Sequence, residues 1–144
     1  MSYLSQVKKP TPQAPVTTIV GFAGSGKSSL AGLFPSPIFI QAENATSVFE
    51  TMPEDLQPAF FPQLPIANAK RNIKTSEVLF EQLRELMTVE HGFKTVVIDS
   101  ITALNIMFEN EVVEFDDKGA SNIGEAQGGY NKGYLVVAGI HAKL

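Results

Sequence analysis

A glycine-rich segment constrains this chain more than any other feature of its sequence. Residues 21–28 read Gly-Phe-Ala-Gly-Ser-Gly-Lys-Ser and match the pattern G-x-x-x-x-G-K-[ST] at every defined position. Glycines let the backbone bend so that successive N–H groups point inward at a phosphate. Such a loop needs a strand before it and a helix after it, whose dipole adds positive potential. The β-branched run 16–20 and an expected helix at 27–33 meet that requirement.

The pattern predicts a nucleoside triphosphate site, with ATP and Mg²⁺ as the expected ligands. Lys27 should reach the β- and γ-phosphates, and the Ser28 hydroxyl should coordinate Mg²⁺. The alternative is a chance glycine-rich turn, which the flanking strand and helix disfavour. The residues expected to contact the nucleotide are Gly21, Phe22, Ala23, Gly24, Ser25, Gly26, Lys27, Ser28 and Ser29.

Composition limits the class of protein. The chain has 144 residues, of which 44% are hydrophobic and 18% charged, as in a globular domain with a core. No apolar run approaches the roughly 18 residues of a membrane span, and no cysteine is present for a disulfide or thiolate metal site. We expect a cytoplasmic protein with a flexible, proline-containing arm at 1–15 and an ATPase domain at 16–144. The net charge of −4 argues against a generally basic surface but leaves room for a local basic strip.

Apolar runs alternate with helical patterns along the rest of the chain. This alternation predicts an α/β fold of the P-loop NTPase type, a parallel sheet with helices on both faces. The expected strands are 16–20, 38–42, an edge strand around 65–69, and 95–98, which should be buried on both faces. The expected helices are a short one near 47–50, then 75–90 with Thr75 as its cap, 102–115 and 133–144.

Two carboxylates follow predicted strands. Asp99 closes the strand 95–98, and the carboxyl ends of parallel strands form the ligand crevice, so Asp99 should help to hold Mg²⁺, largely through water. Its alternative role is to cap the next helix, which Ser100 can also do. Glu43 lies just past the strand 38–42, where a carboxylate can activate water. The alternative for Glu43 is an exposed loop residue.

These residues give the chain a resemblance to the RecA-like ATPases. The segment Phe39-Ile-Gln-Ala-Glu43-Asn-Ala resembles that family's strand ending in its catalytic glutamate, and Val96-Val-Ile-Asp99-Ser-Ile-Thr-Ala-Leu104 resembles its metal-binding strand. The stretch Ala126-Gln-Gly-Gly-Tyr130-Asn-Lys-Gly-Tyr134 is similar to one found in compact phage RecA-like single-strand annealing recombinases. The resemblance covers about 16–144 and implies a homo-oligomeric, DNA-stimulated ATPase with Glu43 and Lys27 in catalysis.

The resemblance also implies a DNA-contacting loop at 116–132. Tyr130 and Tyr134 are the candidates for base stacking and Lys132 for a phosphate contact with single-stranded DNA. The alternative is a flexible connector whose tyrosines pack on the domain.

Charged residues in two segments argue for and against DNA binding. Asp116, Asp117 and Glu125 would repel phosphates. A basic cluster at Lys70, Arg71 and Lys74 would add a salt-sensitive contact, or is a solvated loop.

The chain departs from the family's pattern in two respects. The family has a further strand between the phosphate-loop strand and the Asp99 strand, and no segment after Leu144 supplies it. We therefore expect a C-terminally truncated form, or a strand borrowed from another chain. Only two arginines are present, Arg71 and Arg84, and neither is well placed in the sequence as a trans-acting finger.

Two other functions stay open from the sequence. A small P-loop kinase would use the same loop, but it needs an arginine-rich lid over the transferred phosphate, which two arginines do not supply. A nucleotide-dependent binding or loading module with little hydrolysis would use the loop as a switch.

Overall fold

The computed structural model describes residues 14–144, so nearly all of the predicted arm at 1–15 lies outside the described residues. Its centre is a three-stranded parallel sheet in the order β2-β1-β3. The strands are β1 (Pro37–Gln41), β2 (Ala59–Phe60) and β3 (Thr95–Asp99). The register pairs Gln41 with Asp99, so the two polar strand ends lie side by side.

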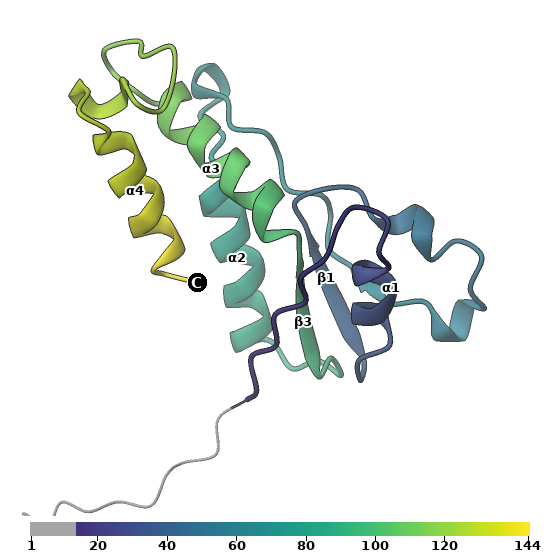
Figure 1. The fold of residues 1–144 in the computed structure, drawn as a ribbon. Coiled ribbons are helices and arrows are strands. Elements are labelled where there is room, and N and C mark those ends of the chain that lie inside the picture. Colours follow the sequence, from purple (N-terminus) through teal and green to yellow (C-terminus); the bar gives the residue numbers. More distant parts are fainter. Residues whose placement is uncertain (1–13) are drawn as a thin grey trace, which may run out of the picture.

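The described residues contain four α-helices, with α1 on one side of the sheet and the other three on the opposite side, where α4 packs on α3 (Figure 1). They are α1 (Lys27–Gly32), α2 (Thr75–Thr88), α3 (Ile101–Glu114) and α4 (Lys132–His141). Short 3₁₀ turns occur at Thr46–Val48, Glu54–Leu56, Ala69–Arg71 and Ala126–Gly128. The predicted α/β class is confirmed. None of the helices in the described part of the chain is long and apolar enough to cross a membrane.

Side chains of β1 alternate between two hydrophobic clusters, one on each face of the sheet. Phe39 packs with Phe49 and Phe60 on the face that α1 covers. Ile40 packs on the other face against Leu79 of α2 and a group of α3 and α4 residues. Helices therefore cover both faces, as predicted from the alternation of strand and helix patterns.

The prediction of a buried strand at 16–20 is wrong. This segment is extended but pairs with no strand, and Val16 and Val20 are 96% and 89% exposed. Ile19 packs against the Phe39 cluster, as does Val97 of β3. A β-branched run forms a strand only where a neighbour satisfies its backbone groups. Among residues 14–144 no strand lies between this segment and β3, and the further strand expected there stays a prediction.

Strand β3 is less buried than predicted. Val96 is 45% exposed, although continuous apolar runs are typical of strands covered on both faces. On its β1 side the strand is fully paired from Thr95 to Asp99. Its other edge has no partner in the part of the chain that is described, which explains the incomplete burial.

The edge strand lies earlier than predicted, at β2 rather than around 65–69. Proline supplies no N–H to a ladder, so Pro62 and Pro65 disfavour regular pairing beyond Phe60. Side chains satisfy the carbonyls there instead: Gln82 donates to Pro62 O at 3.1 Å and Thr75 donates to Pro65 O at 2.8 Å. The segment is therefore held against α2 by side chains.

Helix α2 begins without the predicted Thr75 cap. Lys74 is the N-cap residue, and Thr75 is the first helical residue, with its hydroxyl bonded to Pro65 O. The buried carboxylate of Glu111, from α3, accepts a 2.8 Å bond from Ser76 N and another from Ser76 Oγ. Free N–H groups at a helix start attract a carboxylate, so Glu111 joins α3 to α2 at this point.

Candidate functional site

The phosphate-loop pattern forms an exposed turn that leads into α1, as predicted. Gly24 and Gly26 have φ angles of 75° and 82°, a backbone region that favours glycine. Lys27 Nζ donates to Phe22 O at 2.9 Å, and Ser25 N donates to the same carbonyl at 3.2 Å. The ammonium group therefore lies over its own loop. An anionic phosphate oxygen is a stronger partner for it than a neutral carbonyl.

The structure brings Ser28 and Asp99 together. Ser28 Oγ donates to Asp99 Oδ2 at 2.6 Å, and Asp99 is only 8% exposed at the end of β3. A hydroxyl and a carboxylate are oxygen ligands of the kind Mg²⁺ takes. The alternative role of Asp99 as a helix cap is excluded, because Ser100 caps α3 by accepting from Ala103 N at 3.2 Å.

The protein ligands alone do not complete a metal site. Within residues 14–144 no group of three or more His, Cys, Asp or Glu side chains is arranged to hold a metal. Mg²⁺ in nucleotide sites is usually held by one or two protein groups together with phosphate oxygens and water. Ser28 and Asp99 fit that arrangement, in which the nucleotide supplies the other ligands.

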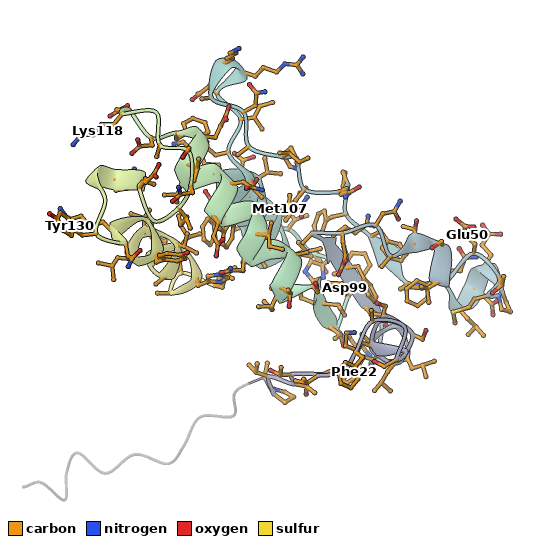
Figure 2. The ribbon with its side chains drawn as sticks, turned by 45° about the horizontal axis from the view of Figure 1, so that its top comes forward. Phe22, Glu50, Asp99, Met107, Lys118 and Tyr130 are labelled. Carbon is orange, nitrogen blue, oxygen red and sulfur yellow. The ribbon has the colours of Figure 1, made fainter. Side chains whose placement is uncertain are left out.

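Glu43 lies at the same edge of the sheet. Its backbone N–H donates to Asp99 O at 3.3 Å, and Ala42 N donates to that carbonyl at 3.0 Å. The Glu43 side chain is exposed. The backbone of Glu43 is therefore directly beside Asp99, and its role as a water-activating group stays a prediction. Figure 2 shows Asp99 close to the loop that carries Phe22.

Gln41 is a site residue that the sequence reasoning missed. It pairs with Asp99 in the sheet and is 6% exposed, with Nε2 donating to Phe61 O at 2.7 Å. Leu64 N also donates to Gln41 O at 2.9 Å. The sequence did carry a signal for it, because a polar residue follows the otherwise apolar run 38–40. Gln41 fixes the edge of the sheet beside Asp99.

The three candidate DNA-contacting residues lie far from the nucleotide loop. Figure 2 places Tyr130 and Phe22 at different ends of the molecule, with α3 between them. Tyr130 is 95% exposed and Tyr134 is 47% exposed, and Lys132 between them is exposed as well. Tyr130 therefore does not pack on the domain, whereas about half of the surface of Tyr134 is covered, and DNA contact by these residues stays a prediction.

Many internal hydrogen bonds fix the backbone of the loop 116–131. Asp116 accepts three backbone N–H bonds, from Gln127 at 2.7 Å and from Ala120 and Lys118 at 3.1 Å each. These donors, Gln127 first, hold the pKa of Asp116 below its usual value. Residues 127–131 all have φ between 53° and 89°. A carboxylate that sequence reasoning treated as a repulsive charge is the organiser of the loop.

One of the three residues of the predicted basic cluster, Lys74, has local partners in the structure. Lys74 Nζ pairs with Glu77 Oε1 at 2.9 Å and lies 5.3 Å from the centre of the Phe115 ring. Its bond to Glu77 raises the pKa of Lys74 above its usual value. Lys70 and Arg71 remain exposed at the Ala69–Arg71 turn. Only two members of the cluster are therefore free of local partners.

Comparison with known proteins gives one finding about the family. A family model described as an AAA domain matches residues 13–141, nearly the whole chain. No curated protein and no solved structure shows a significant match. The matched region contains the exposed glycine loop, the Ser28–Asp99 contact and the parallel sheet with flanking helices. The chain belongs to the AAA-domain family of P-loop ATPases, which are nucleotide-binding proteins.

Proposed function

We propose that the chain binds ATP with Mg²⁺, hydrolyses ATP, and acts as an oligomer on single-stranded DNA in recombination or annealing of the phage type. The observation that carries the nucleotide part is the contact between Ser28 of the loop and Asp99 of β3, 71 positions apart in sequence, with Glu43 beside them. Lys27 directly precedes Ser28, so a lysine, two oxygen groups for Mg²⁺ and a further glutamate come from positions at or next to this contact.

Each residue has a defined task in this proposal. Lys27 binds the β- and γ-phosphate oxygens, exchanging its bond to Phe22 O for them. Ser28 and Asp99 would hold Mg²⁺, whose charge offsets that of the phosphates. Glu43 accepts a proton from a water molecule as the water oxygen bonds to the γ-phosphorus. The bond from that phosphorus to the β–γ bridging oxygen breaks, which releases ADP and inorganic phosphate.

The DNA part rests on the resemblance to phage recombinases and on the form of the loop 116–131. Tyr130 is held outward by a backbone that Asp116 fixes, and an ordered aromatic side chain loses little entropy when a base stacks on it. Lys132 follows two residues later as a phosphate contact. The charge of Asp116 faces three N–H donors of its own loop, which reduces its repulsion of a phosphate.

The arrangement disfavours a kinase. Arg71 lies on the 3₁₀ turn Ala69–Arg71, and Arg84 lies on the outer side of α2 beside Glu81 and Glu85. The structure places neither of these arginines at the edge of the sheet that holds Asp99. A transferred phosphate would therefore lack the clamp that kinases use.

The test measures ATP binding, and then hydrolysis with and without single-stranded DNA, on the full chain. Lys27→Ala should lose binding, while Lys94→Ala, which removes an exposed lysine away from the loop, should retain it. DNA-stimulated hydrolysis supports the proposal. Binding without hydrolysis, with or without DNA, indicates a binding or loading module instead. Equal ATP binding by wild type and Lys27→Ala overturns the assignment of the loop.

A further inference from the structure

The segment 68–73 is a small, well-fixed hairpin. Asn68 N donates to Ile73 O at 2.8 Å, and Ile73 N donates back to Asn68 O at 2.9 Å. Asn68 Oδ1 accepts a 3.0 Å bond from Arg71 N, and Asn72 turns the chain with a φ of 52°. A closed turn of this kind presents its two tip residues, Lys70 and Arg71, in a defined position.

The hairpin is attached to the end of α3 that leads into the loop 116–131. Glu114, the last residue of α3, accepts a 3.0 Å bond from Ala69 N through Oε1. Asp116, which organises the loop, follows two residues later. Both views show the hairpin and the loop at the end of α3 remote from α1 (Figures 1 and 2). Two separate segments of the chain thus meet at one end of the molecule.

The two cations at the tip of the hairpin form no ion pair within the described part of the chain. Among residues 14–144 neither the Lys70 ammonium nor the Arg71 guanidinium forms a hydrogen bond within the protein or an ion pair. Arg84, by contrast, shares a shallow surface hollow with Glu81 and Glu85. The Glu114 carboxylate, which contacts the hairpin, accepts its bond from the backbone of Ala69. A free guanidinium on a fixed turn is suited to bind a phosphate through two parallel N–H bonds.

A groove lies between the residue that follows the hairpin and the loop. Lys74, directly after the hairpin, and Gln127 of the loop both line a groove of about 340 Å³ between α2, α3 and α4. Phe80 and Phe115 contribute aromatic surface to it. Glu77 and Glu111 also line it, and both carboxylates are bonded within the protein, Glu77 to Lys74 and Glu111 to Ser76. Cations next to aromatic surface are usual elements of a single-strand binding surface.

We propose that Lys70 and Arg71, at the tip of the hairpin 68–73, form a second contact with single-stranded nucleic acid and bind its phosphates next to the Tyr130 loop. This inference rests on the proposed DNA-binding function. Of the three basic residues that the sequence grouped as a possible salt-sensitive contact, it selects the two at the tip of the hairpin and leaves out Lys74, which pairs with Glu77. Because the contact is made to phosphates, it is independent of base sequence and weakens as salt is added.

Fluorescence anisotropy of a labelled oligo(dT) measures the contact, with the full chain in Mg-ATP between 50 and 200 mM salt. The test variant is Lys70→Gln with Arg71→Gln. The matched control, Lys94→Gln with Arg84→Gln, changes net charge equally on other surfaces. Loss of two phosphate contacts should weaken binding by about tenfold and reduce the slope of log K against log salt by about 1.4. The control should change affinity less than about twofold, and Asp117→Asn, which removes an exposed negative charge from the loop, should tighten binding.

The outcomes separate this inference from the function on which it rests. If the wild type binds nucleotide but no oligonucleotide, the proposed DNA function and this inference are both wrong. If the wild type binds DNA and the hairpin variant behaves as the control, only the hairpin contact is wrong. If Arg71→Gln abolishes ATP hydrolysis and leaves DNA binding unchanged, Arg71 acts on a nucleotide in a second copy of the chain, and the inference is overturned. Equal thermal unfolding of all variants shows that folding is not the cause.

Discussion

Ser28 donates a 2.6 Å hydrogen bond to Asp99, a residue 71 positions away in the sequence. The bond connects the start of α1 to the end of β3 and thereby fixes the loop against the sheet. Both oxygens would turn toward Mg²⁺ when nucleotide binds. This contact therefore predicts the behaviour of Asp99→Asn. The unliganded fold should change little, by about 1 kcal/mol, because asparagine still accepts a bond from Ser28 but without charge.

The same substitution should weaken ATP binding in Mg²⁺ by about 10- to 100-fold, because a carboxylate that orients the metal's water is lost. Titration of ATP in Mg²⁺ and in EDTA measures this effect. The variant and the wild type should bind equally in EDTA. A similar loss in EDTA would show that Asp99 acts on the fold of the loop instead of on the metal.

Glu43→Gln should separate ATP binding from hydrolysis. Glutamine keeps the size of the side chain but cannot accept a proton from water, and a general base contributes about 10²- to 10⁴-fold to a rate. We expect that loss in hydrolysis with unchanged ATP affinity. Glu50→Gln is the control, since Glu50 is exposed and lies well away from Asp99 in Figure 2. Full activity of Glu43→Gln would assign water activation to another group.

Two glycines in α4 should respond in opposite directions to alanine. A Cβ at Gly133 would collide with the carbonyl and side chain of Ile123, whereas nothing lies within 4 Å of a Cβ at Gly139. Gly133→Ala should lower the free energy of unfolding by about 1–3 kcal/mol through overpacking. Gly139→Ala should raise it by about 0.5–1 kcal/mol through helix propensity. Denaturant unfolding measures both, and equal effects would contradict the packing of the loop on α4.

Acid should release the loop 116–131. The pKa of Asp116 is lowered from its usual 3.8, chiefly by the bond from Gln127 N, so its contribution to folding is complete above about pH 4. That contribution is lost as pH falls through the lower folded-state pKa. We expect the amides of Gln127, Ala120 and Lys118 to lose protection from exchange together in this range, with those of β1 still protected. Asp116→Asn should lose that protection at neutral pH. Unchanged protection in Asp116→Asn would show that the loop is held by other contacts.

The nucleotide loop was predictable because its signal is local. Each glycine and the lysine of 21–28 are required by the backbone path of a few consecutive residues. The helices α2 and α3 were also predictable, to within about two residues, because apolar residues repeat along a single segment. Asp99 and Glu43 could be assigned to one edge because parallel strands end on the same side of a sheet.

The remaining features depend on partners far along the chain. The β-branched run 16–20 has strand propensity, but propensity does not supply a hydrogen-bonding neighbour, and in this fold the run is exposed. Thr75 looked like a helix cap, yet its hydroxyl bonds Pro65 O, and Glu111 from another helix occupies the helix start. Asp116 reads as a repulsive charge in the sequence, and only the folded loop shows it holding three N–H groups.

The sequence by itself therefore determined the chemistry of the phosphate loop, the alternation of strands and helices, and the carboxylates at the strand ends. Only the tertiary structure decided that Ser28 bonds directly to Asp99, how the loop 116–131 is held, and that the hairpin 68–73 lies beside that loop. The physical reason is the separation along the chain of the residues that interact. Backbone turns and helical repeats are set by neighbouring residues, whereas hydrogen-bond partners and exposed faces are set by segments that come together only when the chain folds.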